Sequence, residues 1–371
     1  MVEIWFPYGE TKVFASLDMF RVAFEQNLPE MKKMDEKKTL EELMDKLNQI
    51  KARRICIYYC TTNHPKIAEL LNEFLNEFSY SGGKFEIRLV GPKGIRIKNS
   101  LEIINGHQAA IRQRNSEVCE DYDVGIHIGC ALPSHLFGIS GIGESLLELK
   151  KEPISEEVLG EFLTEVENER LKVSLDLIYS VEESLVDKNL ISVVFLPSFE
   201  GVSDMRIGSL GETASEVSTT LKEMYGIQMP YVDGLIVSLG GAPYDYSMSD
   251  SLDMMTSVIQ PSKSVEYGFI AEWKRGLGDE KIISSFRKSL KELKLQVLNR
   301  FDWTDLIAYV LRTGELLKGT NVLTSLPHTL IKRTIGCRQC ETANKLVQRV
   351  LHPAGDGKLG IIKSLPNAYL R

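Results

Sequence analysis

Several short apolar runs in this chain each end in a loop rich in glycine, threonine or proline, and this pattern restricts the chain to few folds. The clearest runs are residues 54–60 (RICIYYC), 123–130 (DVGIHIGC) and 232–239 (VDGLIVSL), and segments with helical periodicity lie between them. Continuously apolar strands are typical of parallel sheets that helices cover on both faces. The sequence therefore predicts the α/β fold class, with mostly parallel sheets and ligand loops at the carboxyl ends of the strands.

The length and one interruption of the pattern predict two domains. At roughly 150 residues per domain, 371 residues favour two. Gly226 and Pro230 interrupt the pattern before a second series of strands and helices begins. We expect an N-terminal domain over residues 1–226 and a C-terminal domain over residues 227–354. Within the second, Asp279 is expected to cap a single helix over residues 280–293.

Charge, hydropathy and cysteine content exclude several classes of partner. The net charge is −7 and no basic stripe is interleaved with aromatic residues, so we expect no nucleic acid partner. No apolar run approaches the roughly 18 residues of a membrane span, so we expect no membrane partner. The first residues do not resemble a signal peptide, which predicts a cytoplasmic protein whose six cysteines are reduced.

Two loops of the first half are candidate ligand sites. Thr61 and Thr62 follow a strand and open a helix, where free N–H groups attract anions; the alternative is an ordinary turn with threonine caps. Residues 130–149 carry glycines that permit close backbone approach, serine donors such as Ser140, and His135, which has the chemistry of a proton carrier. The alternative there is a loop with an exposed histidine.

Two loops of the second half follow neighbouring strands. Residues 240–245 (GGAPYD) and 276–278 (GLG) suggest a crevice at the strand ends, with a pair of tight turns as the alternative. Neither loop is a dinucleotide fingerprint. Cys337 and Cys340 form a lone CxxC between two helical segments, so we predict no metal site. His127 lies in an apolar strand and is interpreted as a core residue.

Taken in order, these segments resemble the nickel-dependent lactate racemases over essentially the full chain. Residues 6–9 (FPYG) resemble the Leu-Pro-Tyr-Gly near the family's N-terminus, and residues 123–149 resemble its Pro-His and Ser-Gly-Gly-x-Lys-Ser stretch. Residues 232–245 resemble its Ser-x-Gly-Gly-Tyr-Pro-x-Asp segment, and residues 271–278 its Ala-Glu and Gly-Leu-Gly. Residues 360–370 resemble its closing strand and Pro-x-x-Tyr.

The resemblance implies two α/β domains with the active site in a cleft between them, and a closing segment, residues 355–371, that returns to the N-terminal domain. It also implies a nickel-pincer nucleotide tethered to a lysine, which exchanges a hydride while histidines move a proton. Glu144 stands at the tethering lysine, and Ser134 at a catalytic histidine with His135 beside it. A carboxylate cannot form the amine-derived tether, so we expect no tethered cofactor, although the resemblance leaves the nickel-pincer nucleotide itself open.

Other family positions are also replaced. Tyr59 and Thr62 stand where the family has aspartate and the arginine that clamps the substrate carboxylate. Ser249, Asp250 and Asp253 replace its tyrosine, glutamine and lysine. The changes run toward acid, which disfavours a phosphate-bearing nucleotide and an anionic hydroxy acid.

The sequence leaves three functions open. The first is a non-racemising protein that binds a small molecule in the cleft, the second an enzyme of different acid/base chemistry, and the third a 2-hydroxy acid racemase that uses His135 and an untethered cofactor. An oligomer or a partner paralogue also stays open. The catalytic candidates are His135, Glu144 and Asp250; the ligand-binding candidates are Thr61, Thr62, Ser134, Ser140, Gly141, Gly240, Gly241, Tyr244, Asp245, Gly276 and Gly278.

Overall fold

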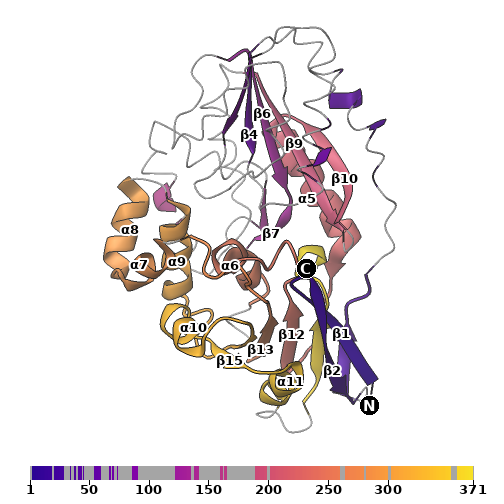
Figure 1. The fold of residues 1–371 in the computed structure, drawn as a ribbon, viewed down its shortest axis with the longest axis vertical. Coiled ribbons are helices and arrows are strands. Elements are labelled where there is room, and N and C mark those ends of the chain that lie inside the picture. The colour runs from indigo at the N-terminus through magenta and orange to yellow at the C-terminus, as the bar shows by residue number, and fades with distance from the viewer. Residues whose placement is uncertain are drawn as a thin grey trace.

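A computed structural model provides the three-dimensional description of the chain. It describes residues 2–18, 21–28, 34, 37–38, 41–43, 45, 54–59, 67, 69–70, 73, 86–90, 122–134, 138–141, 159–161, 163–164, 189–198, 201–259, 264–279, 281–299, 302–351 and 357–370. Figure 1 shows two sheets, one above the other, with the N-terminal hairpin beside the lower one.

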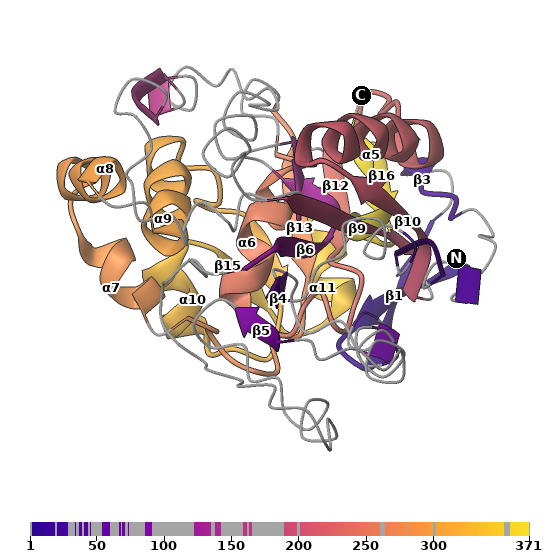
Figure 2. The ribbon, with the colours of Figure 1, turned by 90° about the horizontal axis from the view of Figure 1, so that it is seen from above.

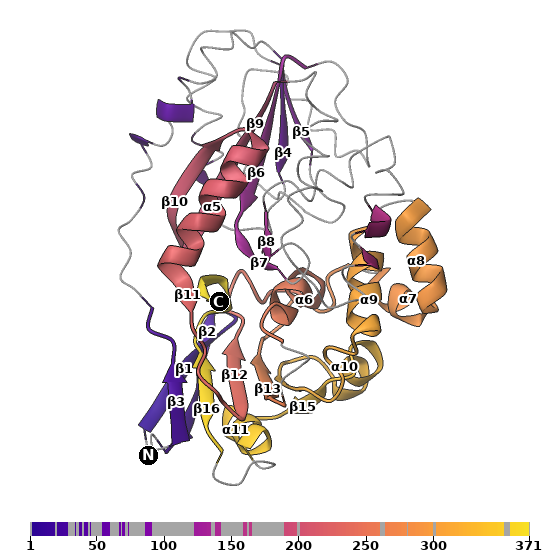
Figure 3. The ribbon, with the colours of Figure 1, turned by 180° about the vertical axis from the view of Figure 1, so that it is seen from behind.

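The upper sheet has five strands in the order β10-β9-β6-β4-β5. All neighbours are parallel except β10 and β9, which form an antiparallel pair. Every residue of β6 is buried, which explains its uninterrupted apolar sequence. Helix α5 packs on β9 and β10 (Figure 3). The bounds are β4 Arg54–Tyr59, β5 Glu86–Val90, β6 Val124–Cys130, β9 Leu190–Ser198, β10 Gly201–Gly208 and α5 Leu210–Tyr225.

The lower sheet has six parallel strands in the order β15-β14-β13-β12-β16-β3. Its third and fourth strands run to the two glycine-rich loops that the sequence singles out. The bounds are β3 Val22–Glu25, β12 Gly234–Ser238, β13 Glu266–Ile270, β14 Asn321–Leu323, β15 Arg338–Cys340 and β16 Leu359–Ile362.

Different elements cover the two faces of the lower sheet. On one face, Ile236 of β12 and Ile270 of β13 pack with Phe6 of the N-terminal hairpin and with α11. On the other face, Val237 packs in a cluster that includes residues of α6 and α9. Helices α7, α8 and α9 lie together on the side of the molecule away from α5 (Figure 2). The bounds are β1 Val2–Tyr8, β2 Thr11–Leu17, α6 Met248–Thr256, α7 Lys281–Arg287, α8 Leu290–Asn299, α9 Trp303–Thr313, α10 His328–Thr334 and α11 Ala343–Leu351.

A buried polar network connects the two sheets. The Gln26 side-chain amide donates to the carbonyl oxygens of Ser364 (3.2 Å) and Asn367 (2.5 Å), and its oxygen accepts from the Ser364 N–H (2.9 Å). Asn367 donates to the carbonyl oxygen of Pro197 on β9 (3.2 Å), which also accepts from the Tyr225 hydroxyl (2.7 Å). The remaining elements are β7 Leu132–Ser134, β8 Gly138–Ser140, β11 Gly226–Ile227, η4 Leu365–Asn367 and β17 Tyr369–Leu370, and β17 pairs with β11.

The predicted α/β class with mostly parallel sheets is confirmed, whereas one local prediction is wrong. The expected single helix over residues 280–293 is two helices, α7 and α8, because Ser289 forms a new N-cap: its N–H donates to Glu292 and its hydroxyl accepts from the Glu292 N–H. The Cys337–Cys340 segment lies between helices α10 and α11, as predicted, and it contains a short strand, β15, that the sequence did not predict.

The domain boundaries at residues 226 and 354 stay a prediction, and strand membership adds two facts to it. β3, from the first 30 residues, pairs with β16 in the lower sheet, and the β1–β2 hairpin packs on the same sheet.

Cys130, Cys337 and Cys340 are free thiols, while Cys56 is disulfide-bonded, so the prediction of reduced cysteines is wrong for Cys56. No helix in the described part of the chain is long and apolar enough to cross a membrane.

Candidate functional site

Three of the segments singled out in the sequence meet at the carboxyl ends of β12 and β13. The carboxylate of Asp245, in the loop after β12, accepts hydrogen bonds from the backbone N–H of Gly9 (2.8 Å) and of Glu272 (3.0 Å). Gly9 lies in the turn of the N-terminal hairpin, and Glu272 follows β13. We call Tyr8, Gly9, Asp245 and Glu272 the hairpin–strand junction.

The glycines after β12 allow the hairpin to approach this closely. Gly240 and Gly241 both adopt positive φ angles, of 94° and 72°. A Cβ on Gly241 would lie 2.9 Å from the Gly9 carbonyl oxygen and 2.9 Å from the Pro7 Cβ. Ala242 then donates its N–H to that same Gly9 oxygen (2.8 Å). Gly240 and Gly241 therefore have a packing role in this structure, which is the tight-turn alternative.

The junction concentrates acidic groups in a partly buried place. Asp245 is fully buried, and burial raises the pKa of its carboxyl group despite the two backbone donors. Its second oxygen is buried and has no hydrogen-bond partner among the described residues. Burial, then the negative charges of Glu272 and Asp245, raise the pKa of the Tyr8 hydroxyl to about 12. Asp245 thus acts first as a clamp between backbone segments, not as a solvent-exposed acid.

The first N–H groups of α6 are bonded to the glycine loop after β13 and to the helix's own N-cap. Met248 and Ser249 donate their N–H groups to the carbonyl oxygens of Gly276 (3.1 Å) and Leu277 (2.9 Å). The N–H of Asp250 donates to the Ser247 hydroxyl (3.4 Å), the N-cap of the helix. An anion approaching this helix end finds these three donors already bonded.

Ser249 and Asp250 are the residues that the sequence resemblance aligned with a tyrosine and a glutamine. The Ser249 hydroxyl accepts from the Asp279 N–H (3.0 Å) and donates to the Asp250 carboxylate (3.2 Å). A Cβ on Gly278 would lie 2.0 Å from the Ser249 oxygen, so Gly278 leaves space for that hydroxyl. Asp250 itself is exposed. Gly276 and Gly278 therefore brace the helix start here.

After β6, the predicted loop begins with two short antiparallel strands, β7 and β8, which form a small sheet of their own. Ser134 is buried, and the Ser140 hydroxyl donates to the Leu132 carbonyl oxygen (3.4 Å). Gly141, with φ of 82°, packs against Cys130 so closely that a Cβ would lie 2.0 Å from the Cys130 carbonyl oxygen. β7 contacts α6, so this loop and the helix that carries Asp250 are neighbours.

Four candidates, His135, Glu144, Thr61 and Thr62, lie outside the described residues. Tyr244 is buried, and burial raises the pKa of its hydroxyl well above its usual range. Tyr8 and Glu272 were missed as site residues. Both residues lie in segments that carry the resemblance, but the sequence does not show that the hairpin turn contacts the ends of β12 and β13.

Two further sequence predictions concern histidine and cysteine chemistry. His127 is a buried core residue, as predicted; its Nδ1 lies 3.2 Å from the Ser192 hydroxyl, and burial lowers the pKa of its imidazole to about 3. Cys337 directly precedes strand β15 and Cys340 is its last residue, and three residues of strand span about 10 Å, too far for a disulfide between them. Among the described residues, no cluster of histidine, cysteine or acid could hold a metal.

The fold defines the class: a two-sheet α/β protein whose glycine-rich loops gather at strand ends. A solved structure shares this fold. A lactate racemase apoprotein from Thermoanaerobacterium thermosaccharolyticum superposes with a TM-score of 0.73, covering 100% of both chains at 16% identity. This chain therefore has a lactate-racemase-like fold. No protein-family model and no curated protein matches the sequence.

Proposed function

We propose that this chain is a non-racemising protein of lactate-racemase-like fold, which binds a neutral or cationic small molecule between its two sheets. The observation that carries the proposal is the first turn of α6. Its N–H donors are bonded within the chain, its serine hydroxyl braces the next loop, and its exposed side chain is the carboxylate of Asp250. An anionic hydroxy acid gains no donor there and meets a negative charge.

Two cations in the loop after β13 are engaged within the chain. Lys274 pairs with Glu10 (3.3 Å), and the Arg275 guanidinium stacks on the Tyr246 ring, 4.2 Å from its centroid. The buried Asp245 already has a raised pKa because burial disfavours its charge, and a second negative charge close by would disfavour it further. These groups do not suit a phosphate-bearing nucleotide cofactor.

Metal analysis and intact mass provide the test. The chain is co-expressed with enzymes that synthesise the nickel-pincer nucleotide, and an authentic lactate racemase is prepared in parallel as the positive control. We expect nickel and a nucleotide-sized adduct in the control and neither in this chain. An adduct on this chain, or interconversion of 2-hydroxy acid enantiomers after adding the cofactor, would overturn the proposal.

An acid/base enzyme is the second candidate, and the hairpin–strand junction favours it. Tyr8 and Asp245 both have raised pKa values; the Glu272 charge contributes to the shift of Tyr8, and the Glu272 N–H donates to Asp245. Such groupings provide general acids and bases. The test is turnover over a panel of neutral and amine substrates. Glu144→Gln, Asp250→Asn and Glu272→Gln should each lower it, while Glu161→Gln, on an exposed helical residue, should not. Unchanged turnover in the first three would refute this candidate.

A further inference from the structure

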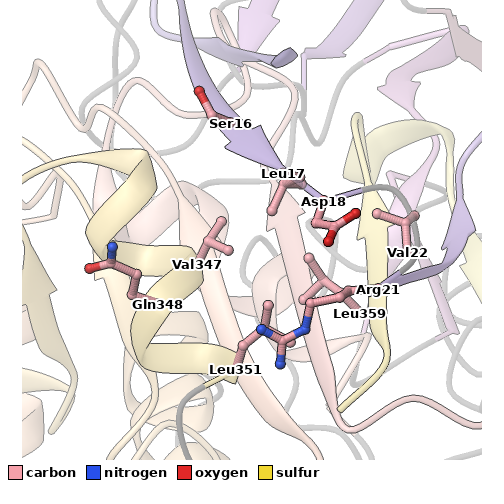
Figure 4. Close-up of a pocket in the computed structure, with 9 residues that line it drawn as sticks. All are labelled: Ser16, Leu17, Asp18, Arg21, Val22, Val347, Gln348, Leu351 and Leu359. Carbon is pink, nitrogen blue, oxygen red and sulfur yellow. The ribbon is translucent and has the colours of Figure 1, made fainter. Parts of the chain in front are cut away.

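A pocket opens at the end of the lower sheet opposite the hairpin–strand junction. Its volume is about 510 Å³, within the range of small-molecule sites. It is bordered by the last residue of β2, the first residues of β3 and β16, and the last turn of α11 (Figure 4). The junction lies at the carboxyl ends of the parallel strands and this pocket at their amino ends, so the two are separate.

Most of the pocket wall is aliphatic. Leu17, Val347, Leu351 and Leu359 line it and are each at most 6% exposed, and Val22 completes the apolar wall. The pocket lies between β2 and β3 because these strands belong to different sheets and do not pair. The chain leaves β2 at Leu17 and enters the lower sheet at Val22. A branched aliphatic group fits such a wall, because burial of apolar surface is favourable.

Two opposite charges line the same pocket. Asp18 and Arg21 belong to one turn, in which the Arg21 N–H donates to the Asp18 carbonyl oxygen (3.0 Å). Figure 4 shows the Arg21 side chain extending toward Leu351, while the Asp18 carboxylate lies near Leu17 and Val22. Both side chains also interact within the chain, but a guanidinium has five N–H donors and a carboxylate about four acceptor positions, so each can serve a ligand in addition.

We propose that this pocket binds a small zwitterion with a branched aliphatic side chain, such as a free apolar α-amino acid or its dipeptide. The planar guanidinium of Arg21 suits a ligand carboxylate, the Asp18 carboxylate suits an ammonium group, and the aliphatic wall takes the side chain. A pocket with one charge of each sign favours a neutral zwitterion over a simple anion or a simple amine. This inference does not depend on the proposed function of the strand-end site.

The experiment is calorimetric titration of the full chain with leucine and leucyl-leucine, each up to about 10 mM. Two probes each lack one charge: 4-methylpentanoate has no ammonium group, and 3-methylbutylamine has no carboxylate. At least one zwitterion should bind, and each single-charge probe should bind about tenfold more weakly or worse. No binding of either zwitterion, or equal binding of the pentanoate, overturns the proposal.

Variants locate the site. Arg21→Met keeps the aliphatic stem and should weaken zwitterion binding about tenfold, and Asp18→Asn should act in the same direction. Lys12→Gln, an exposed cation on β2 outside the pocket, is the matched control and should bind like the parent chain. If Arg21→Met fails to fold, Gln348→Phe tests the same point, because it places a ring at the exposed rim on α11 and should block entry. Binding that survives the folded variants overturns the proposal.

Discussion

Substitution of Asp245 by alanine removes the acceptor that holds the hairpin turn against the strand ends. In the parent chain one carboxylate oxygen accepts from the Gly9 and Glu272 N–H groups, which come from segments far apart in the sequence. Alanine leaves both donors without that partner in a buried place. Trp273 donates its own N–H to the backbone oxygen of Asp245 (2.9 Å), a bond that the substitution leaves intact.

The cost follows from the two lost bonds. A buried donor left without an acceptor costs about 1–3 kcal/mol, so two cost about 2–6 kcal/mol. Relief from burying a charge offsets part of this, since the pKa of Asp245 is raised by burial. We expect a net local destabilisation of about 2–4 kcal/mol, which corresponds to amide exchange about 30- to 1,000-fold faster. Asp245→Asn keeps an acceptor oxygen and should cost less.

Amide hydrogen exchange read by mass spectrometry is the assay, because local opening can be measured without assuming two-state unfolding. Peptides that contain Gly9 and Glu272 should exchange faster in Asp245→Ala, and less so in Asp245→Asn. Peptides from β6, in the other sheet, are the control. If Gly9 and Glu272 exchange at the parent rate in the alanine variant, the clamp has no energetic role and the argument fails.

The same variant pair has a pH signature. The folded pKa of Asp245 lies above its unfolded value, so the neutral form is favoured by folding. The stability that this pKa shift contributes to the folded state is fully present below the unfolded pKa and is lost as pH rises through the folded pKa. The parent chain should therefore gain stability relative to Asp245→Asn as pH falls through the folded pKa toward about 3.9. A difference independent of pH would contradict the burial of this charge.

Three other substitutions or treatments test the packing. Gly129→Ala should lower the free energy of unfolding by about 3 kcal/mol or more, seen as a lower melting temperature, because its Cβ would lie 1.9 Å from a backbone oxygen. Gly160→Ala, in open helical space, should instead raise the free energy of unfolding by up to about 1 kcal/mol. Cys337 and Cys340 should stay as two thiols under mild oxidation and should react with Ellman's reagent only after denaturation. The reason is that both are buried, and burial raises the pKa of Cys337 to about 12. A disulfide between them, found by peptide mapping, would contradict the strand geometry. Gln26→Leu should cost about 2–4 kcal/mol in thermal unfolding, because it leaves a buried N–H and two carbonyl oxygens without their side-chain partner.

Sequence reasoning succeeded where burial alone decides the structure. β6 and β12 are buried at every position, and an apolar run ending in glycine is enough to place such strands. It failed where a short polar signal competes with periodicity. Ser289 and Glu292 form a capping box that divides the expected helix, and this Ser-x-x-Glu signal was readable in the sequence.

The candidate site shows a different limit. The loops after β12 and β13 were expected near each other, because parallel strands end at one edge of a sheet. The participation of the hairpin turn was not predictable, since Gly9 and Asp245 are 236 residues apart and the pattern around each is local. Whether Gly241 leaves space for a ligand or for a packing contact also depends on the distant Gly9, so the sequence could not decide between these two interpretations.

The pairing of β3 with β16 has a consequence for how this protein is made. The hydrogen bonds between Gln26 and Ser364 join residues 338 positions apart, so the first strand of the lower sheet finds its neighbour only when nearly all of the chain has been synthesised. Pairing across such separations is slow, because loop closure costs entropy before the contacts form. During that interval the apolar face of the β1–β2 hairpin lacks its cover, and we expect emerging chains to be prone to aggregation until the lower sheet has formed.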